Sequence, residues 1–306
     1  MPPLSAVRQT SGRGVFVLAL ALACATPTPR GAGVVGARPQ AAPGDACSEG
    51  VCVWIERHLA GLSLVAQNNR HFDAWVRLEQ AALENLTPLP SLPFDAQLPP
   101  RSRRALLALR SLHPGEPWSG SFASYRVTIG DPRARHDERA RYRLPFADGA
   151  GRLLSQGVGG SFSHGERQRY AFDFPMPEGS RVLAARAGTV ALVRDRFEAG
   201  GVESELLSRA NAVVIRHDDG TFASYAHLRA GGAAVREGER VAAGRLLGFS
   251  GNTGYSRGPH LHFCVWKASA LDGEPETLPI RFDDGSREGF VPVAGGRYAP
   301  PRTLLD

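Results

Sequence analysis

Two histidines separated by one residue are the first candidates for chemistry in this chain, in the segment Gly258-Pro-His-Leu-His-Phe263. Residues two apart in a β-strand point to the same side, so His260 and His262 are expected to project together. Two imidazoles on one face lose hydration unless they bind something, which favours a metal ion or a reacting group. The pair alone does not decide between a metal site and histidines that are simply packed.

Further side chains that bind metals lie in two other segments of the second half. Tyr225-Ala-His-Leu228 places His227 at the end of an apolar run, and His164 and Asp173 lie upstream of it. Zinc accepts imidazole nitrogen and carboxylate oxygen, and a hydrolytic zinc needs three protein ligands and one open position. A further group must take the proton of the attacking water. Three ligands plus two unligated histidines meet these needs, so the sequence favours one zinc ion per chain.

The segment from about Leu144 to Ala294 resembles the lysostaphin/LytM-type zinc endopeptidases. The stretches that carry the resemblance, in order, are Asp173-Phe-Pro-Met-Pro-Glu-Gly179, Val182-Leu-Ala-Ala-Arg-Ala-Gly-Thr-Val190, Asn211-Ala-Val-Val-Ile-Arg-His-Asp-Asp-Gly220, Tyr225-Ala-His-Leu228, Gly251-Asn-Thr-Gly254 and Gly258-Pro-His-Leu-His-Phe263. The resemblance implies a mainly antiparallel β-fold with a groove over the metal.

The resemblance also implies a role for each candidate residue. Asp173 and His262 are expected to bind zinc, and His227 and His260 to orient or deprotonate the attacking water. Sequence does not assign these last two roles separately. The residues expected to line the substrate groove are Asn211, Tyr225 and Arg257.

Two positions depart from the family pattern. Family members often place the first histidine ligand four residues before the aspartate, where this chain has Arg169. His164, nine residues before Asp173, resembles the arrangement of a subgroup with a longer turn, and we expect it to be the first ligand. The alternative is an incomplete, inactive site. Arg257 stands where a small polar residue is more usual, and is expected at the groove rim, where it tunes substrate choice.

The function that this resemblance implies is hydrolysis of peptide cross-links in bacterial peptidoglycan by a zinc endopeptidase. Cross-links with meso-diaminopimelate and glycine-rich bridges both suit such a groove. The alternative function is that of an inactive LytM-like module, which binds the wall or activates wall amidases. Zinc content of the purified protein separates the two, because a scaffold without catalysis should carry none.

Apolar residues alternate with polar ones through the first half, as in Val51, Val53 and Ile55, which is typical of half-buried strands. Pro-rich breaks separate such runs, so residues 45–148 are expected to form an accessory Ig-like β-sandwich. Val53–Ala66 is also compatible with a helix. We place the domain boundary near Pro145–Gly149 and assign residues 149–306 to the peptidase domain, with a barrel-sandwich hybrid texture.

Strand-like runs continue through the second half. They are Val182–Ala185, Thr189–Val193, Ala212–Arg216, Thr221–Tyr225 and Leu261–Trp266. The turn residues Asp218-Asp219-Gly220 lie between two of these runs and predict a hairpin. His217, next to this turn, is expected to be a surface histidine at a strand end. The second domain is therefore expected to be mainly β as well.

The first residues indicate export. Arg8 and Arg13 precede an apolar run from Val15 to Ala25 that ends in small residues, which is typical of a signal peptide over residues 1–25. Cys24 leaves open a lipoprotein anchored in the membrane, although Ala21 occupies a position where a lipobox prefers Leu. Residues 26–44 are rich in Pro, Gly and Ala and are expected to form a flexible linker. The expected location is periplasmic or extracellular.

Four cysteines fit this exported setting. Cys47 and Cys52 are expected to form a disulfide that closes a small loop. Cys264 lies in an apolar run and is expected to be a buried, inert thiol.

The overall charge and the remaining motifs limit the other functions. The net charge of +6 favours anionic partners such as wall polymers, and no nucleic-acid motif accompanies it. Ser250 and Ser256 lie among glycines without a general base of the Ser-His-Asp kind. A biotinyl or lipoyl carrier needs a hairpin lysine, whereas Lys267 is the only lysine here. We therefore expect a monomeric enzyme whose partner is peptidoglycan.

Overall fold

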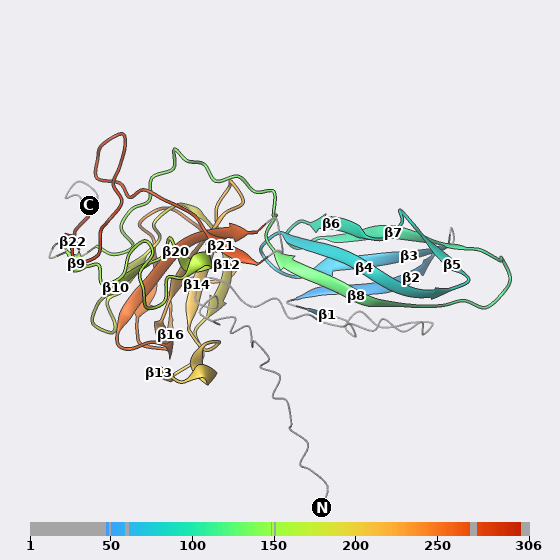
Figure 1. The fold of residues 1–306 in the computed structure, drawn as a ribbon, viewed down its shortest axis with the longest axis horizontal. Helices are drawn as coiled ribbons and strands as arrows, with labels where there is room; N and C mark the ends of the chain where they lie inside the picture. Colours follow the sequence, from blue (N-terminus) through green and yellow to red (C-terminus); the bar gives the residue numbers. More distant parts are fainter. Residues whose placement is uncertain are drawn as a thin grey trace, which may run out of the picture.

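The computed structural model describes residues 47–48, 50–58, 61–147, 149, 151–269 and 274–300. These residues form two β units, which lie side by side in Figure 1. The described part contains only two short 3-10 helices, η1 (Glu166–Gln168) and η2 (Ser204–Leu206), and no α-helix. The prediction of a mainly β protein is therefore confirmed.

The N-terminal unit consists of two antiparallel sheets. The larger sheet has the order β1 (Cys47–Ser48), β2 (Val51–His58), β3 (Gly61–Asn68), β7 (Arg103–Ser111) and β5 (Leu86–Leu89). The smaller sheet has the order β6 (Phe94–Leu98), β4 (Ala74–Glu84) and β8 (Ser119–Ile129). Val53 and Leu64 of one sheet share a buried core with Val76 and Val127 of the other. The alternative of a helix over Val53–Ala66 is wrong, because β2 and β3 pair there.

The C-terminal unit is built on a larger sheet. Its strands, in spatial order, are β10 (Phe172–Pro175), β20 (His260–Ala268), β15 (Phe222–Ala226), β14 (Ala212–Arg216), β12 (Gly188–Arg194) and β17 (Arg240–Val241), and β21 (Pro275–Thr277) also pairs with β20. The expected hairpin at Asp218–Gly220 is confirmed, since β14 and β15 are antiparallel neighbours on either side of it.

Smaller sheets complete this unit. They are β11 (Arg181–Leu183) with β18 (Leu246–Ser250) and β16 (Leu228–Ala233), β9 (Arg152–Leu153) with β22 (Arg297–Tyr298), and β13 (Gly200–Gly201) with β19 (Gly254–Tyr255). The core between the larger sheet and the β11–β18–β16 sheet contains Phe172, Phe174, Leu261 and Phe263.

Strand β20 explains how one element serves both core and site. Leu261 and Phe263 pack into the core of the C-terminal unit. The alternate residues face the other way, and His260 and His262 are among them. Further along this second face, Trp266 belongs to a buried cluster that also contains Phe72 of the N-terminal unit.

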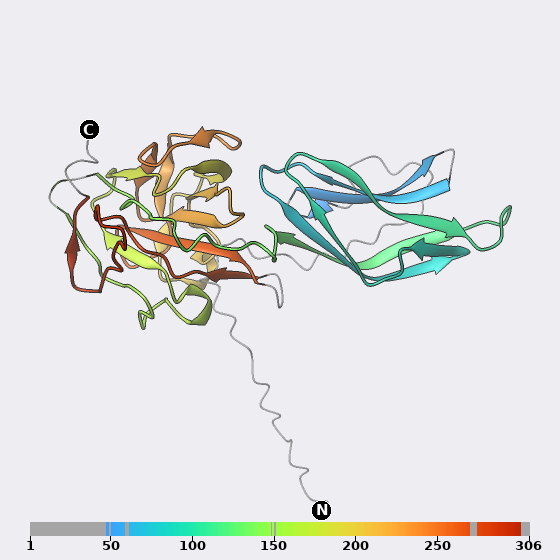
Figure 2. The same ribbon diagram turned by 90° about the horizontal axis from the view of Figure 1, so that it is seen from above.

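The two units meet at that cluster. Phe222 of the C-terminal unit packs there, and its ring stacks on Trp266 with centroids 4.5 Å apart. Asp73 of the N-terminal unit forms an ion pair with Arg216 of β14. Figure 2 shows the N-terminal unit beside one end of the large sheet of the C-terminal unit, which contains β20. The contact is therefore made away from the end of β20 that carries the histidines. The proposed domain boundary near Pro145–Gly149 stays a prediction.

Several expectations concern residues outside the described part. The signal peptide, Cys24 and the linker all precede residue 47, and the Cys47 side chain is not described either, so the Cys47–Cys52 pairing stays a prediction. Cys264 is buried as expected. The expectation that it is a free thiol is wrong, because Cys264 is disulfide-bonded, as is Cys52, and burial alone does not reveal a bonded sulfur. Among the described residues, no helix has the length and apolar character needed to span a bilayer.

Candidate metal centre

Strand register places Asp173 and His262 opposite each other. Asp173 of β10 pairs with His262 of β20, and the flanking residues Phe172 and Phe174 are fully buried in the core. Because side chains alternate along a strand, core packing by the two phenylalanines turns the carboxylate to the other face. His262 Nδ1 lies 2.8 Å from Asp173 Oδ1. Burial lowers the pKa of His262, although Asp173 opposes that effect.

His164 reaches the same point from a loop. Its backbone N–H donates to the Gly160 carbonyl, which closes a turn just before η1. Its Nδ1 lies 2.8 Å from the Gly157 carbonyl, so Nδ1 carries the proton in the neutral ring and Nε2 keeps a lone pair. Nε2 is 3.3 Å from Asp173 Oδ2, is buried, and makes no hydrogen bond with any described residue.

Electrostatics at the carboxylate match this arrangement. Burial opposes ionisation of Asp173, yet the neighbouring His164 and His262 hold its pKa well below the usual value. Burial also disfavours the charged form of His164, but the adjacent carboxylate outweighs it and raises the pKa of that ring. Asp173 is therefore ionised at neutral pH, as a metal ligand must be.

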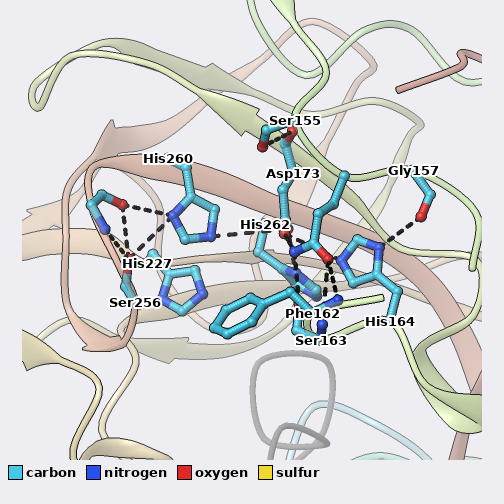
Figure 3. Close-up of polar contacts among 12 residues, drawn as sticks. Ser155, Gly157, Phe162, Ser163, His164, Asp173, His227, Ser256, His260 and His262 are labelled. Atoms are coloured by element: carbon cyan, nitrogen blue, oxygen red, sulfur yellow. Dashed lines mark hydrogen bonds and ion pairs between the residues drawn. The ribbon is translucent and has the colours of Figure 1, made fainter. Parts of the chain in front are cut away.

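The donor set fits a zinc ion. His164, Asp173 and His262 are all buried and offer ligand atoms within 4.8 Å of one another. Two imidazoles and one carboxylate form a common set for catalytic zinc. The buried Nε2 of His164 without a partner is the kind of atom that a metal would satisfy. Figure 3 shows Asp173 between His164 on one side and His260 on the other.

Gln156 supports the carboxylate, and the sequence did not single it out. Its Nε2 donates to Asp173 Oδ2 at 2.7 Å and lies 2.9 Å from Ser163 Oγ. Its Oε1 accepts the backbone N–H groups of Phe162 and Ser163. The amide thus ties the loop that carries His164 to the strand that carries Asp173. A lone glutamine in a glycine-rich segment carries no signal of this role.

His260 and His227 lie beside the three donors. His260 Nδ1 is 2.8 Å from the Gly258 carbonyl, and its Nε2 is 3.9 Å from Asp173 Oδ1. His227 directly follows β15 with a φ of 63°, and its Nδ1 lies 2.7 Å from the Thr253 carbonyl. The two ring centroids are 4.4 Å apart. Burial lowers the pKa of His227 to about 3, so this ring is neutral at neutral pH.

A pocket of about 430 Å³ opens over these side chains. Part of its lining comes from Ser155, Gln156, Phe162 and Ser163, and part from residues 255–260. Asp173, His227, His260 and His262 all contribute to its lining. The pocket thus gives a substrate access to the histidines and the carboxylate.

Of the residues expected in the groove, only Arg257 lines this pocket. The expectation is wrong for Asn211, which is fully buried and bonds the Phe197 and Leu228 carbonyls. It is wrong for Tyr225 too, a core residue whose hydroxyl accepts the Ala185 N–H. Both side chains are fully buried, and burial prevents contact with a ligand.

Two further positions are placed by the structure. Arg169, at the usual position of the first ligand, is exposed and lies outside the donor cluster. His217 was expected at the surface, and that expectation is wrong because the ring is fully buried. Its Nδ1 lies 2.8 Å from the Ala187 carbonyl, and burial lowers its pKa to about 4. The Tyr142 ring lies edge-on against the His217 ring with centroids 5.8 Å apart, a contact that position along the strand does not reveal.

Comparison with known proteins agrees with the geometry. Residues 167–275 match the model of Peptidase family M23. Peptidoglycan DD-endopeptidase ShyA of Vibrio cholerae is 37% identical over 91 residues, which are 30% of this chain and 18% of that protein. DD-carboxypeptidase/endopeptidase Mpg of Neisseria meningitidis is 36% identical over 112 residues, 37% of this chain and 22% of that protein. The chain therefore spans only about a fifth of the length of these relatives.

A solved structure is similar as well. The catalytic domain of lysostaphin from Staphylococcus simulans aligns with 27% identity and a TM-score of 0.31, covering 41% of this chain and 88% of that domain. The sequence matches confirm the expected resemblance to lysostaphin/LytM-type peptidases for the segment that they cover. The family model itself covers residues 167–275, within the C-terminal unit.

Proposed function

With residues 167–275 assigned to peptidase family M23, we propose that this protein is a zinc-dependent endopeptidase that hydrolyses peptide cross-links of peptidoglycan. The observation that carries the proposal is the convergence of His164, Asp173 and His262 beneath a pocket. The names of ShyA and Mpg support the substrate. We assign the peptidase domain to residues 149–306 and an accessory domain to residues 45–148.

In this proposal, the three donors hold one zinc ion. Zinc supplies a Lewis acid for the scissile carbonyl and lowers the pKa of water toward about 7. His227 lines the pocket with Nδ1 held by the Thr253 carbonyl, so its other ring nitrogen is available to accept a proton. His260, held by the Gly258 carbonyl, lies close enough to share the transfer or to donate a hydrogen bond to the developing oxyanion.

Gln156 has a positioning role in this scheme. By donating to Asp173 Oδ2 at 2.7 Å, it leaves Oδ1 nearer to His262 and His260. Outer contacts of this kind orient a ligating carboxylate and fix its geometry. The same amide holds the Phe162–Ser163 backbone, and so it also steadies the loop of His164.

The cellular setting is part of the proposal. Peptidoglycan lies outside the cytoplasm, which agrees with the export signal that we infer at residues 1–25, with or without a lipid on Cys24. The net charge of +6 favours approach to an anionic wall. The accessory domain, joined to the enzyme at the Phe72 and Trp266 cluster, positions a monomeric enzyme on that wall.

Digestion of purified sacculi tests the function directly. The purified protein should release un-cross-linked muropeptides, which mass spectrometry identifies together with the bond that was cut. Treatment with a chelator should abolish release, and one equivalent of zinc should restore it. Intact cross-links after incubation with protein that contains stoichiometric zinc would rule the proposal out.

A further inference from the structure

One cationic side chain stands apart from the other charged groups of the pocket. Arg257 lies in its wall between Ser256 and Gly258, and it is the only lysine or arginine in the lining. Both neighbours contact the proposed catalytic ring, since Ser256 Oγ and the Gly258 carbonyl lie 3.2 and 2.8 Å from His260 Nδ1. The guanidinium therefore projects from the same short turn that holds His260.

Arg257 contacts an aromatic ring that also lines the pocket. Its guanidinium carbon lies 3.6 Å from the ring centroid of Phe162. The Phe162 ring also stacks with Tyr255, with centroids 6.2 Å apart and planes 16° apart. Contact with a ring engages the flat face of a guanidinium and leaves the N–H donors at its edge free. Phe162 thus orients the cation without satisfying its hydrogen bonds.

Some arginines of this unit are instead paired with carboxylates. Arg186 bonds Asp219 at 2.7 Å, and exposed Arg240 bonds both oxygens of Asp218 at 2.7 Å. Arg257 forms no ion pair or side-chain hydrogen bond with any residue that the structure describes. A guanidinium held over a pocket with its donors unused matches the fork geometry of a carboxylate.

We propose that Arg257 is the specificity residue of the groove and binds a free carboxylate of the substrate peptide close to the scissile bond. This inference rests on the proposed function and deepens it. Phe162 presents the guanidinium, and the carboxylate forms two parallel hydrogen bonds with its edge. Peptides whose carboxylate is amidated lose these bonds and keep all others. The substrate class is therefore acidic peptides, and neutral glycine bridges are disfavoured.

Binding of un-cross-linked muropeptides tests this inference without turnover. Such fragments have no cross-link to hydrolyse, and amidation with carbodiimide and ammonium chloride neutralises their carboxylates. Calorimetric titration of the zinc-loaded full chain should give a dissociation constant about 10- to 100-fold lower for the natural fragments than for the amidated ones. In Arg257→Gln this preference should vanish, because affinity falls for the natural fragments alone. Arg257→Lys, which keeps the charge but loses the fork, should retain only part of it.

One control variant and one further test variant complete the experiment. Arg181→Gln removes an exposed arginine of β11 outside the pocket and should leave the preference intact. Phe162→Ala should weaken it, because the guanidinium is no longer oriented. A carboxylate preference that survives in Arg257→Gln overturns the inference, and so does an equal loss of affinity for both forms. Sacculus digestion is measured in a separate experiment. Cleavage of sacculi without a carboxylate preference in binding would contradict this inference alone. A carboxylate preference without cleavage of sacculi would contradict the proposed function.

Discussion

Two buried groups of polar side chains lie in the C-terminal unit. One is the candidate metal centre, and the other is a hairpin network. The hairpin network comprises Tyr142, Arg186, His217 and Asp219. His164 and His217, one in each group, share the same local arrangement. Each has Nδ1 2.8 Å from a backbone carbonyl and a buried Nε2 without a hydrogen-bond partner among the described residues.

The difference lies in the carboxylate beside each ring. Among the described residues, Asp173 has no arginine partner, and three histidines lie around it. The Asp219 carboxylate, in contrast, accepts a hydrogen bond from the Arg186 guanidinium at 2.7 Å and one from the Thr221 hydroxyl at 2.6 Å. An anion that is already neutralised does not attract a cation. We therefore expect a buried histidine with a spare nitrogen to bind a metal only where an ionised carboxylate and further donors meet it.

Loss of a ligand should have the largest effect. His262→Ala should abolish zinc binding, and turnover of sacculi should fall by more than about 10³-fold. His260→Ala should keep its zinc and lose about 10²- to 10⁴-fold in turnover, because only proton transfer or oxyanion contact is removed. Elemental analysis of both purified variants gives the zinc content. Equal zinc content would refute the assignment of His262 as ligand and His260 as catalytic residue.

His217→Gln should have the next largest effect, on the pH dependence of stability. Burial lowers the pKa of His217 to about 4, against about 6.5 in the unfolded chain, so protonation favours unfolding. This contribution is complete above about pH 6.5 and is lost as pH falls toward 4, amounting to roughly 3 kcal/mol. The variant should lose less unfolding free energy than wild type between pH 7 and 4.

Denaturant titrations at several pH values measure that difference, with zinc removed from both proteins. Arg186 and Asp219 influence the ring in opposite directions and are unchanged in the variant, so the comparison isolates His217. Parallel curves for wild type and variant would show that the ring is not buried in its neutral form.

Asp219→Asn should have an intermediate effect on stability. The substitution removes the charge that Arg186 meets and leaves a half-buried guanidinium poorly compensated. We expect the free energy of unfolding to fall by about 1–3 kcal/mol. Turnover should be retained, because Asp219 does not line the pocket. A denaturation midpoint equal to that of wild type would show that the pair contributes nothing.

Asp218→Asn should have the smallest effect and serves as the matched control. Asp218 is the preceding residue of the same turn, but its side chain is 70% exposed, and so is most of Arg240, with which it pairs. Exposed pairs contribute about 0.2–1 kcal/mol and weaken with salt. The midpoint should shift slightly at low salt and not at high salt. A loss as large as that of Asp219→Asn would contradict the assigned role of burial.

Local patterns in the sequence determined much of the fold. Alternation of apolar residues predicted the strands around Val53 and Leu64, because side chains on one face of a strand repeat every two residues. Only the structure shows that the other face is buried as well, by a cluster of Cys52, Trp54 and Val65. The turn at Asp218–Gly220 predicted its hairpin from turn chemistry alone. The spacing of His260 and His262 placed both rings on one face, since parity within a strand is a local property.

Tertiary structure decided which distant residues meet. The approach of His164 to Asp173 depends on a loop closed by hydrogen bonds to Gly157 and Gly160, and on the amide of Gln156. Spacing along the chain does not encode that path. The burial of a side chain is equally non-local, because segments that are distant along the chain pack over it. For that reason His217 was misplaced by sequence, and its burial followed only from the folded chain.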